Sequence, residues 1–226
     1  MKISYILPVY NQENTIAQCI ESLLFQKNED SEIIIINDAS TDYTKEIIDH
    51  FLELKKEIIY IENKERLGAA KCRNIGNERS TGDVIAVCDV DIYYKSRGEA
   101  VEDFFENNPD MDIFCSALHY RDSEEPPQHK YIMEAYSWDF KSKCPIAHST
   151  VAYRRHVIER VKYHEKSIDT DLYEFFLLDC HKAGFKMSGC QNPLMYKVEN
   201  NSKRNVKKAK ALKKKLYKKY GIEVEM

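Results

Sequence analysis

Residues 84–91, with the sequence VIAVCDVD, decide how this chain folds. The first five are apolar, which suits a strand that is buried on both faces of a sheet. Two carboxylates follow, spaced so that both side chains of an extended segment point to the same side. Open α/β sheets bind ligands at the carboxyl ends of their strands. Asp89 and Asp91 are therefore candidate ligands of a divalent cation and its phosphates, although such triplets also arise by chance.

Strands and helices alternate before this stretch. Residues 3–9, 32–36 and 58–61 are apolar runs, and the second contains four consecutive isoleucines. Together with a helix over residues 68–77, this order predicts an α/β fold with a Rossmann-like, mostly parallel central sheet flanked by helices. The apolar residues at helical spacing between the runs are Ile16, Cys19, Ile20, Leu23, Leu24, Ile47, Ile48 and Phe51.

The second half of the chain has a mixed pattern. Apolar spacing and turn residues predict shorter elements there, and Gly184 is expected to end the longest helix. The predicted elements are helices over residues 99–105 and 169–183, strands over residues 113–118, 149–153, 185–188 and 194–198, and a loop over residues 123–129.

Charge divides the chain into an acidic body and a basic tail. Ten Lys or Arg residues and no acid lie between Lys203 and Lys219, which leaves residues 1–202 with 24 bases and 35 acids. An acidic body argues against nucleic-acid binding, and binding of an anionic nucleotide then needs a cation or a local arginine. We therefore divide the chain into a domain of residues 1–202 and a Lys-rich helix of residues 203–226. The tail is either a solvated helix, a peripheral contact with anionic lipids or a nucleic-acid contact.

The chain carries no pattern typical of a secreted or membrane-spanning protein. Its first apolar run contains Pro8 and is too short for a signal peptide, and no stretch approaches the length of a membrane span. The seven cysteines are scattered without a C-x-x-C pair, which indicates reduced thiols. We expect a cytoplasmic protein that contacts the inner face of a membrane if its tail binds lipid.

Four polar segments follow the predicted strands and should meet at one edge of the sheet. The first strand is not followed by a G-x-G-x-x-G motif, which disfavours a dinucleotide-dependent oxidoreductase, and there is no P-loop. The four segments are residues 8–11, 38–42, 68–74 and 89–91.

In this order, the segments resemble the family 2 glycosyltransferases of the GT-A fold. The resemblance is specific over residues 6–13, 37–42, 67–74 and 82–91, and continues more loosely to Tyr196, over about four-fifths of the chain. It implies an inverting sugar transfer that needs Mn²⁺ or Mg²⁺. Residues 1–93 would bind the nucleotide-sugar donor, and residues 94–202 would bind a saccharide or lipid-linked acceptor.

The resemblance also implies roles for individual residues. Asp169 would be the catalytic base, with Asp171 as the alternative. Asp89 would contact the ribose and the metal, and Asp91 the metal and the diphosphate. Asp38 would accept a hydrogen bond from the base, which suits uracil and hence a UDP-sugar. The other implied donor-binding residues are Pro8, Val9, Tyr10, Glu13 and Arg73.

Several alternatives remain open from the residues alone. Asp38 could cap the next helix, although Asp42 is the better candidate, and Glu13 could stabilise a helix N-terminus. His148 lies in the region expected to face the acceptor, but a structural or solvent-exposed histidine is the favoured interpretation. Tyr136 and Trp138 suit either a sugar platform or a core. Rival functions are a sugar nucleotidyltransferase, a catalytically silent relative and a glycosyltransferase for modified nucleic acid. Ile92 and Ile168, which stand where relatives often carry acids, keep the silent relative open.

Overall fold

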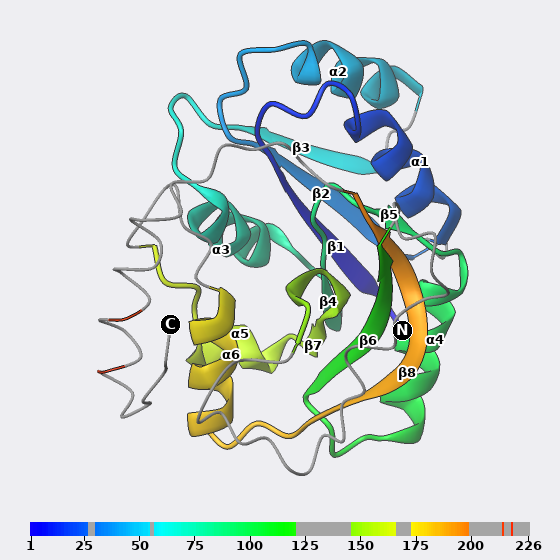
Figure 1. Ribbon diagram of the computed structural model, residues 1–226, viewed down its shortest axis with the longest axis vertical. Helices are drawn as coiled ribbons and strands as arrows, with labels where there is room; N and C mark the ends of the chain where they lie inside the picture. Colours follow the sequence, from blue (N-terminus) through cyan, green and yellow to red (C-terminus); the bar gives the residue numbers. More distant parts are fainter. Residues whose placement is uncertain are drawn as a thin grey trace.

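The computed structural model describes residues 1–26, 30–54, 57–120, 146–165 and 173–198, together with Lys214 and Lys218. Within these ranges, an eight-stranded sheet in the order β3-β2-β1-β4-β7-β6-β8-β5 forms the centre of the molecule. Helices lie against both of its faces (Figure 1). The same ranges contain no helix that is both long and apolar enough to cross a membrane. The predicted loop over residues 123–129, the aromatic residues Tyr136 and Trp138 and nearly all of the basic tail lie outside them.

The first half of the chain forms the predicted parallel sheet. β1 pairs with β2 and β4, β2 also pairs with β3, and all three pairings are parallel. The alternation of strands and helices predicted from the sequence is therefore confirmed. The elements are β1 (Ile3–Val9), α1 (Ile16–Gln26), β2 (Glu32–Asn37), α2 (Thr44–Leu54), β3 (Ile58–Glu62), α3 (Ala69–Arg79) and β4 (Val84–Val87).

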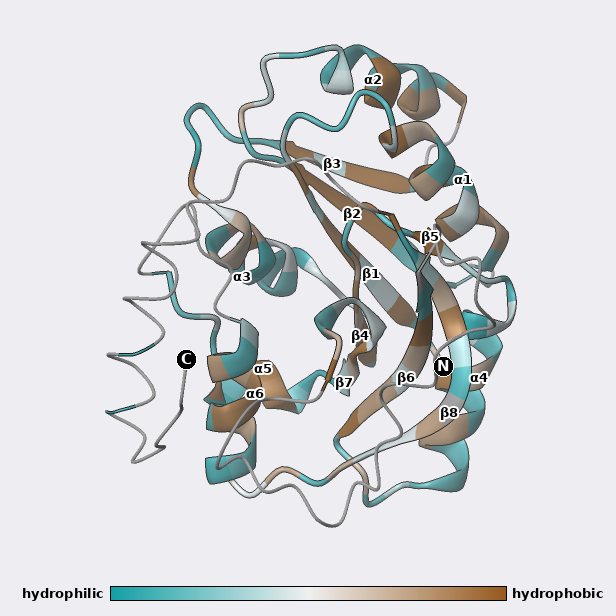
Figure 2. Ribbon diagram, in the orientation of Figure 1, coloured by the Kyte–Doolittle hydropathy of each residue, from teal (hydrophilic) through white to brown (hydrophobic). Residues whose placement is uncertain are grey.

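The four isoleucines of β2 show why this sheet must be covered on both sides. Successive side chains of a strand point to opposite faces. Ile33 and Ile35 accordingly belong to one hydrophobic core, and Ile34 and Ile36 to the other, all of them fully buried. The first core includes residues of α1, α2 and α4 (Ser96–Asn107). The second includes residues of α3, α5 (His156–Arg160) and α6 (Tyr173–Lys182). The strands are accordingly among the most hydrophobic parts of the ribbon (Figure 2).

The second half extends the sheet with mixed pairings. β7 pairs antiparallel with β4 and with β6, β8 runs parallel to β6, and the short β5 closes the edge antiparallel to β8. The elements are β5 (Ile92–Tyr93), α4 (Ser96–Asn107), β6 (Ile113–Tyr120), the 3₁₀ turn η1 (His148–Thr150), β7 (Ala152–Arg154), α5 (His156–Arg160), α6 (Tyr173–Lys182) and β8 (Met187–Lys197).

The predicted strand over residues 149–153 is wrong in its first part. Its beginning forms η1, and only the end belongs to β7. The hydroxyl and the amide of Thr150 both donate to the carbonyl of Ala147, at 2.7 and 3.0 Å. Such local hydrogen bonds of serine and threonine compete with strand pairing.

The two short strands predicted over residues 185–188 and 194–198 are one strand, β8. Its pairing with β6 continues across the expected break, from Ser116 opposite Cys190 to Ala117 opposite Pro193, by a shift in register. A bulge absorbs the extra residues and the proline, which cannot donate to a sheet ladder.

The helix predicted over residues 169–183 corresponds, in its described part, to α6, which ends where the sequence predicts. Gly184 adopts the left-handed conformation with φ of 85°. The amide of the following residue, Phe185, donates back to the carbonyl of Cys180 at 3.1 Å, which completes the helix end. The predicted start of this helix, at residues 169–172, lies outside the described residues.

Gly76 sets how closely α3 can approach the sheet. A Cβ atom at this position would lie 2.5 Å from Cγ2 of Ile6 and 3.0 Å from Cδ1 of Ile36. Replacing a helical glycine by alanine usually stabilises a protein. Here we expect Gly76→Ala to lower the free energy of unfolding by about 1–3 kcal/mol, because the added methyl group overpacks the core.

Urea denaturation of both proteins measures this effect. Arg79→Ala, at an exposed position in the last turn of the same helix, serves as the control and should change stability by less than about 0.5 kcal/mol. An unchanged or higher stability of Gly76→Ala would contradict the close packing of α3.

Candidate active site

The turns that follow β1 and β2 are joined by hydrogen bonds. The amide of Asn11 donates to the Ser40 hydroxyl at 3.1 Å, and the amide of Thr41 donates to the Asn11 side chain at 2.8 Å. Asn11 has a positive φ of 51°, a conformation that asparagine tolerates better than most residues. Two of the four predicted polar segments therefore meet, as the sequence predicts.

Asp38 fixes the loop that leads into α3. Its carboxylate accepts hydrogen bonds from the side chain of Asn63 at 2.9 Å and from the amides of Leu67 and Gly68 at 2.7 and 2.8 Å. The residue is 3 % exposed. Its alternative role as the cap of α2 is wrong, since the Asp42 carboxylate accepts the Thr44 amide at 3.0 Å instead. Contact between Asp38 and a nucleotide base stays a prediction.

Three other predicted donor residues, Val9, Tyr10 and Glu13, contact neighbouring segments. The Glu13 carboxylate accepts the amide of Tyr43, directly before α2, at 3.0 Å. Val9 is buried and its carbonyl accepts the amide of Asp38 at 2.8 Å. The ring of Tyr10 lies 4.1 Å from the guanidinium carbon of Arg66. Glu13 thus has a structural role at a helix N-terminus, and donor contacts of Pro8, Val9, Tyr10 and Glu13 stay predictions.

The chain bends at Asp89 and Asp91, in contrast to the extended segment expected from the sequence. β4 ends at Val87, and the amide of Asp91 donates to the carbonyl of Asp89 at 2.8 Å. The hydroxyl of Tyr93 braces the bend, because it accepts the amide of Asp89 at 2.8 Å and donates to its carbonyl at 3.1 Å. A compact turn, rather than the alternation of a strand, positions the two carboxylates.

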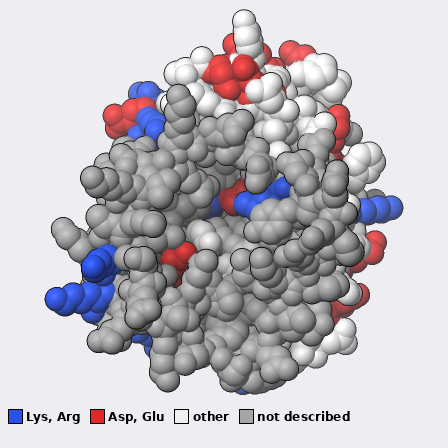
Figure 3. Space-filling model, viewed as in Figure 1, with Lys and Arg blue, Asp and Glu red and all other residues white. Residues whose placement is uncertain are grey.

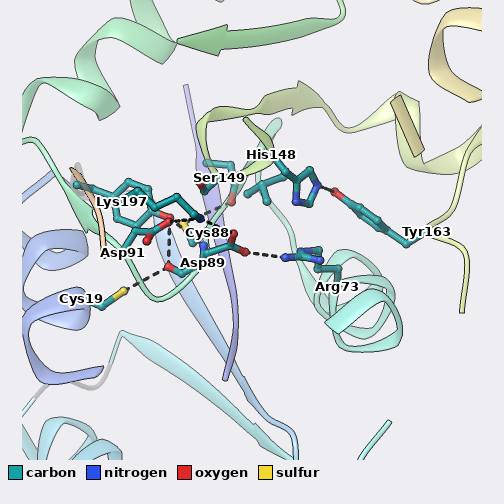
Figure 4. Close-up of polar contacts among 12 residues, drawn as sticks. Cys19, Arg73, Cys88, Asp89, Asp91, His148, Ser149, Tyr163 and Lys197 are labelled. Carbon is teal, nitrogen blue, oxygen red and sulfur yellow. Dashed lines mark hydrogen bonds and ion pairs between the residues drawn. The ribbon is translucent and has the colours of Figure 1, made fainter. Parts of the chain in front are cut away.

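Two cations lie against this pair of carboxylates (Figure 4). Nη2 of Arg73 is 2.6 Å from Oδ1 of Asp89. Nζ of Lys197 is 3.3 Å from Oδ2 of Asp91 and 3.7 Å from Oδ2 of Asp89. The other oxygen of Asp91 accepts the amide of Val198 at 2.9 Å. Arg73 comes from α3 and Lys197 from the end of β8, so the site joins both halves of the chain.

The two carboxylates differ in their affinity for protons. Burial opposes ionisation of Asp89, but the charges of Arg73 and then Lys197 outweigh it and hold its pKa well below the usual range. Asp91 is more deeply buried, with its side chain 1 % exposed against 25 % for Asp89. Burial and the neighbouring charge of Asp89 raise the pKa of Asp91, although Lys197 opposes them. Asp89 is therefore the more readily ionised of the two carboxylates.

The donor set suits a divalent cation that shares its shell with phosphate. The two carboxylates are hard oxygen ligands, and the ammonium of Lys197 already occupies a position between them. Within the described residues, no group of three or more His, Cys, Asp or Glu side chains could hold a metal. Diphosphate oxygens and water would have to complete the coordination shell. Figure 3 shows acidic and basic side chains together near the centre of the face that it draws.

Lys197 and Tyr93 belong to the site, but the sequence did not predict them. Lys197 is 106 residues away from Asp91, and no spacing rule connects them. Tyr93 lies in a strand of only two residues, which gives no periodic signal. His148 is buried rather than solvent-exposed, its Nε2 lies 2.9 Å from the Tyr163 hydroxyl and its ring stacks on Tyr173 at 4.8 Å, while its role towards an acceptor stays untested. Asp169 and Asp171, the candidate bases, lie outside the described residues.

The fold and this edge define an α/β protein in which two carboxylates, an arginine and a lysine meet beyond the carboxyl end of β4. The model of the Glycosyl transferase family 2 matches residues 4–187. The chain therefore belongs to the family 2 glycosyltransferases, a different family from the sugar nucleotidyltransferases considered from the sequence.

Known proteins resemble the chain in sequence and in fold. An uncharacterized glycosyltransferase of Rickettsia bellii is 37% identical over 159 residues, which are 66% of this chain and 22% of the relative. TarS 1-349 of S. aureus in complex with UDP-GlcNAc has a TM-score of 0.76 at 18% identity, over 90% of this chain and 60% of that one. The mannosyltransferase PcManGT of Pyrobaculum calidifontis, in complex with GDP-Man and Mn²⁺, has a TM-score of 0.67 at 18% identity, over 90% and 59%. These structural likenesses establish the GT-A fold.

The contacts of Asp38 predict a local effect of its removal. In Asp38→Ala the amides of Leu67 and Gly68 lose their acceptor. We expect their hydrogen exchange to accelerate and the free energy of unfolding to fall by about 1–3 kcal/mol, because two amides and a side chain lose buried partners. Hydrogen–deuterium exchange with mass spectrometry measures the first effect. Asp49→Ala, at a half-exposed position of α2, is the control, and unchanged exchange of residues 63–68 would refute this role.

Proposed function

We propose that the chain transfers one sugar from a nucleotide-sugar donor to an acceptor hydroxyl, with inversion at the sugar and with help from Mn²⁺ or Mg²⁺. The observation that carries this proposal is the meeting of Asp89, Asp91 and Arg73 at the carboxyl end of β4. The bound UDP-GlcNAc and GDP-Man of two proteins of the same fold support a nucleotide-sugar donor. The Mn²⁺ in one of them supports a divalent ion.

Each residue of the site has a defined part in this proposal. Asp89 and Asp91 hold the cation, which, when bound, neutralises charge that develops on the leaving diphosphate. Arg73 keeps Asp89 ionised and in place, at the edge where the diphosphate would lie. Asp38 positions the loop of residues 63–68 and, as the family resemblance implies, accepts from a uracil base. A UDP-sugar is therefore the donor that we propose.

The acceptor hydroxyl needs a base, because an alcohol is a weak nucleophile until its proton is removed. We assign this role to Asp169, with Asp171 as the alternative, on the resemblance to the family. Donor and acceptor must be held in line for a single displacement, which favours a site that excludes water. We propose a saccharide, a lipid-linked saccharide or another polymer as the acceptor. The Lys-rich tail would then bring the enzyme to an anionic membrane surface.

Nucleotide binding tests the donor site. We expect the wild type to bind UDP more tightly than GDP or CDP, and only in the presence of Mn²⁺ or Mg²⁺. Asp91→Ala should weaken the metal-dependent binding of UDP at least about 100-fold, because one of two protein ligands of the ion is lost. Isothermal titration calorimetry, with each nucleotide and with or without metal, measures both effects.

Asp110→Ala is the matched control for this experiment. Asp110 also pairs with a lysine, Lys186 at 3.0 Å, but its side chain is 61 % exposed and belongs to another part of the surface. Its loss should leave UDP binding unchanged. Failure of the wild type to bind any of the three nucleotides, with or without metal, would refute the proposed donor site.

Turnover tests the assigned base separately from binding. In Asp169→Asn we expect the rate of UDP release from the UDP-sugar to fall by about 10²–10⁴-fold, since an amide cannot accept the proton. The affinity for UDP should remain within about twofold. A coupled assay of UDP release measures the rate, and Asp171→Asn is the parallel variant. If only Asp171→Asn loses activity, the assignment moves to Asp171.

A further inference from the structure

Lys197 occupies the position between the two carboxylates that a metal ion would need. We propose that Lys197 is a resident cation of the donor site. Its ammonium holds Asp89 and Asp91 together in the metal-free protein and competes with the divalent ion for them. This inference rests on the proposed metal site. It concerns what holds the two carboxylates together before metal binds, and how tightly the site binds metal.

The distances show that the ammonium of Lys197 lies against oxygens that the proposed metal ion would also need. The ammonium lies 3.3 Å from Oδ2 of Asp91 and 3.7 Å from Oδ2 of Asp89. A small divalent ion that used these oxygens, at the roughly 2.0–2.1 Å typical of Mg²⁺, would compete with the ammonium for them. Two positive centres in contact repel each other strongly where water is scarce. Metal binding therefore requires the ammonium to leave its present position.

The carboxylates need such a cation when no metal is bound. Asp91 is almost fully buried, and the carboxylate of Asp89 lies close enough for one ammonium to reach both. Arg73 contacts Oδ1 of Asp89, whereas the ammonium of Lys197 lies near Oδ2 of both residues. Lys197 thus contacts both carboxylates. Its charge thus offsets the repulsion that would otherwise separate them.

The backbone around Lys197 is firmly anchored. The amide of Val198 donates to Oδ1 of Asp91 at 2.9 Å, and Tyr196 pairs with Ile92 of β5 and with His119 of β6. The ring of Tyr196 also packs on Tyr94 at 4.9 Å between centroids. The end of β8 therefore fixes the backbone of Lys197 next to the acidic pair.

The side chain of Lys197 can nevertheless leave without disturbing the core. It is 36 % exposed, in contrast to 1 % for Asp91. A lysine ammonium sits on a flexible stem of four carbons, unlike the rigid fork of an arginine. Arg73, whose side chain is 3 % exposed, has no such freedom and remains paired with Asp89. The site thus combines one permanent cation with one exchangeable cation.

Mn²⁺ binding to the full chain tests this competition directly. In Lys197→Met, which keeps the length of the stem and removes the charge, we expect Mn²⁺ to bind roughly tenfold more tightly than to the wild type. Electron paramagnetic resonance of free Mn²⁺, without nucleotide, gives both dissociation constants. Lys162→Met removes the charge of another paired lysine, whose partner is Glu78 at 2.9 Å on the open surface. This control should bind Mn²⁺ as the wild type does.

Thermal unfolding supplies a readout that does not depend on metal. In EDTA, Lys197→Met should melt roughly 4 °C or more below the wild type, because two neighbouring carboxylates lose their shared cation. Saturating Mn²⁺ should close this gap, since the ion replaces the ammonium. Lys162→Met should melt as the wild type does under both conditions. If Lys197→Met does not fold, Lys197→Gln serves in its place with the same expected directions.

The outcomes separate this inference from the proposed function. Mn²⁺ affinity in Lys197→Met that equals or falls below that of the wild type would overturn the competition. If the wild type still binds UDP with metal in that case, the proposed donor site stands. If neither the wild type nor Lys197→Met binds Mn²⁺, with or without UDP, both the competition and the metal site are overturned.

Discussion

The proposed donor site depends on one electrostatic constraint: two carboxylates are forced together just beyond the end of a buried strand. Asp89 and Asp91 lie in a bend that the Tyr93 hydroxyl holds at both the amide and the carbonyl of Asp89. Their charges would drive the bend apart without counter-charges nearby. Arg73 from α3 and Lys197 from β8 supply these charges. The positions of the helix that follows β3 and of the strand that ends the domain are therefore tied to the same few oxygen atoms.

A second arginine, Arg97, supports the bend through backbone carbonyls and the ring of Tyr93. Arg97 is fully buried. Its Nη2 donates to the carbonyl of Val87 at 2.8 Å and to that of Ser149 at 3.3 Å, while its guanidinium carbon lies 4.5 Å from the centroid of the Tyr93 ring. Carbonyl groups at the end of β4 and in η1 thus receive a charged donor that pairing between strands does not supply. The same guanidinium lies against the aromatic ring whose hydroxyl holds the bend.

How far the sequence predicted this molecule depends on the range of the interactions. The parallel half was predictable because a doubly covered strand must be apolar throughout, as in the isoleucine run of β2. The convergence of polar turns followed from the same topology. The sequence could not reveal that η1 replaces the start of a strand, since the hydrogen bonds of Thr150 compete locally with pairing. Nor could it place Lys197, because a contact across 106 residues leaves no periodic trace.

The long separation between Asp91 and Lys197 has a consequence for the order in which the chain matures. During synthesis, β1 to β4 leave the ribosome well before β8, and strands with few distant contacts can begin to pair at that stage. The bend after β4 then contains an acidic pair that still lacks its lysine. Docking of β8 between β6 and β5 brings in that lysine and joins β5 to the sheet in one event. Completion of the fold and completion of the proposed donor site are thus a single late step, so a nascent chain that is not yet fully folded also lacks the lysine of that site.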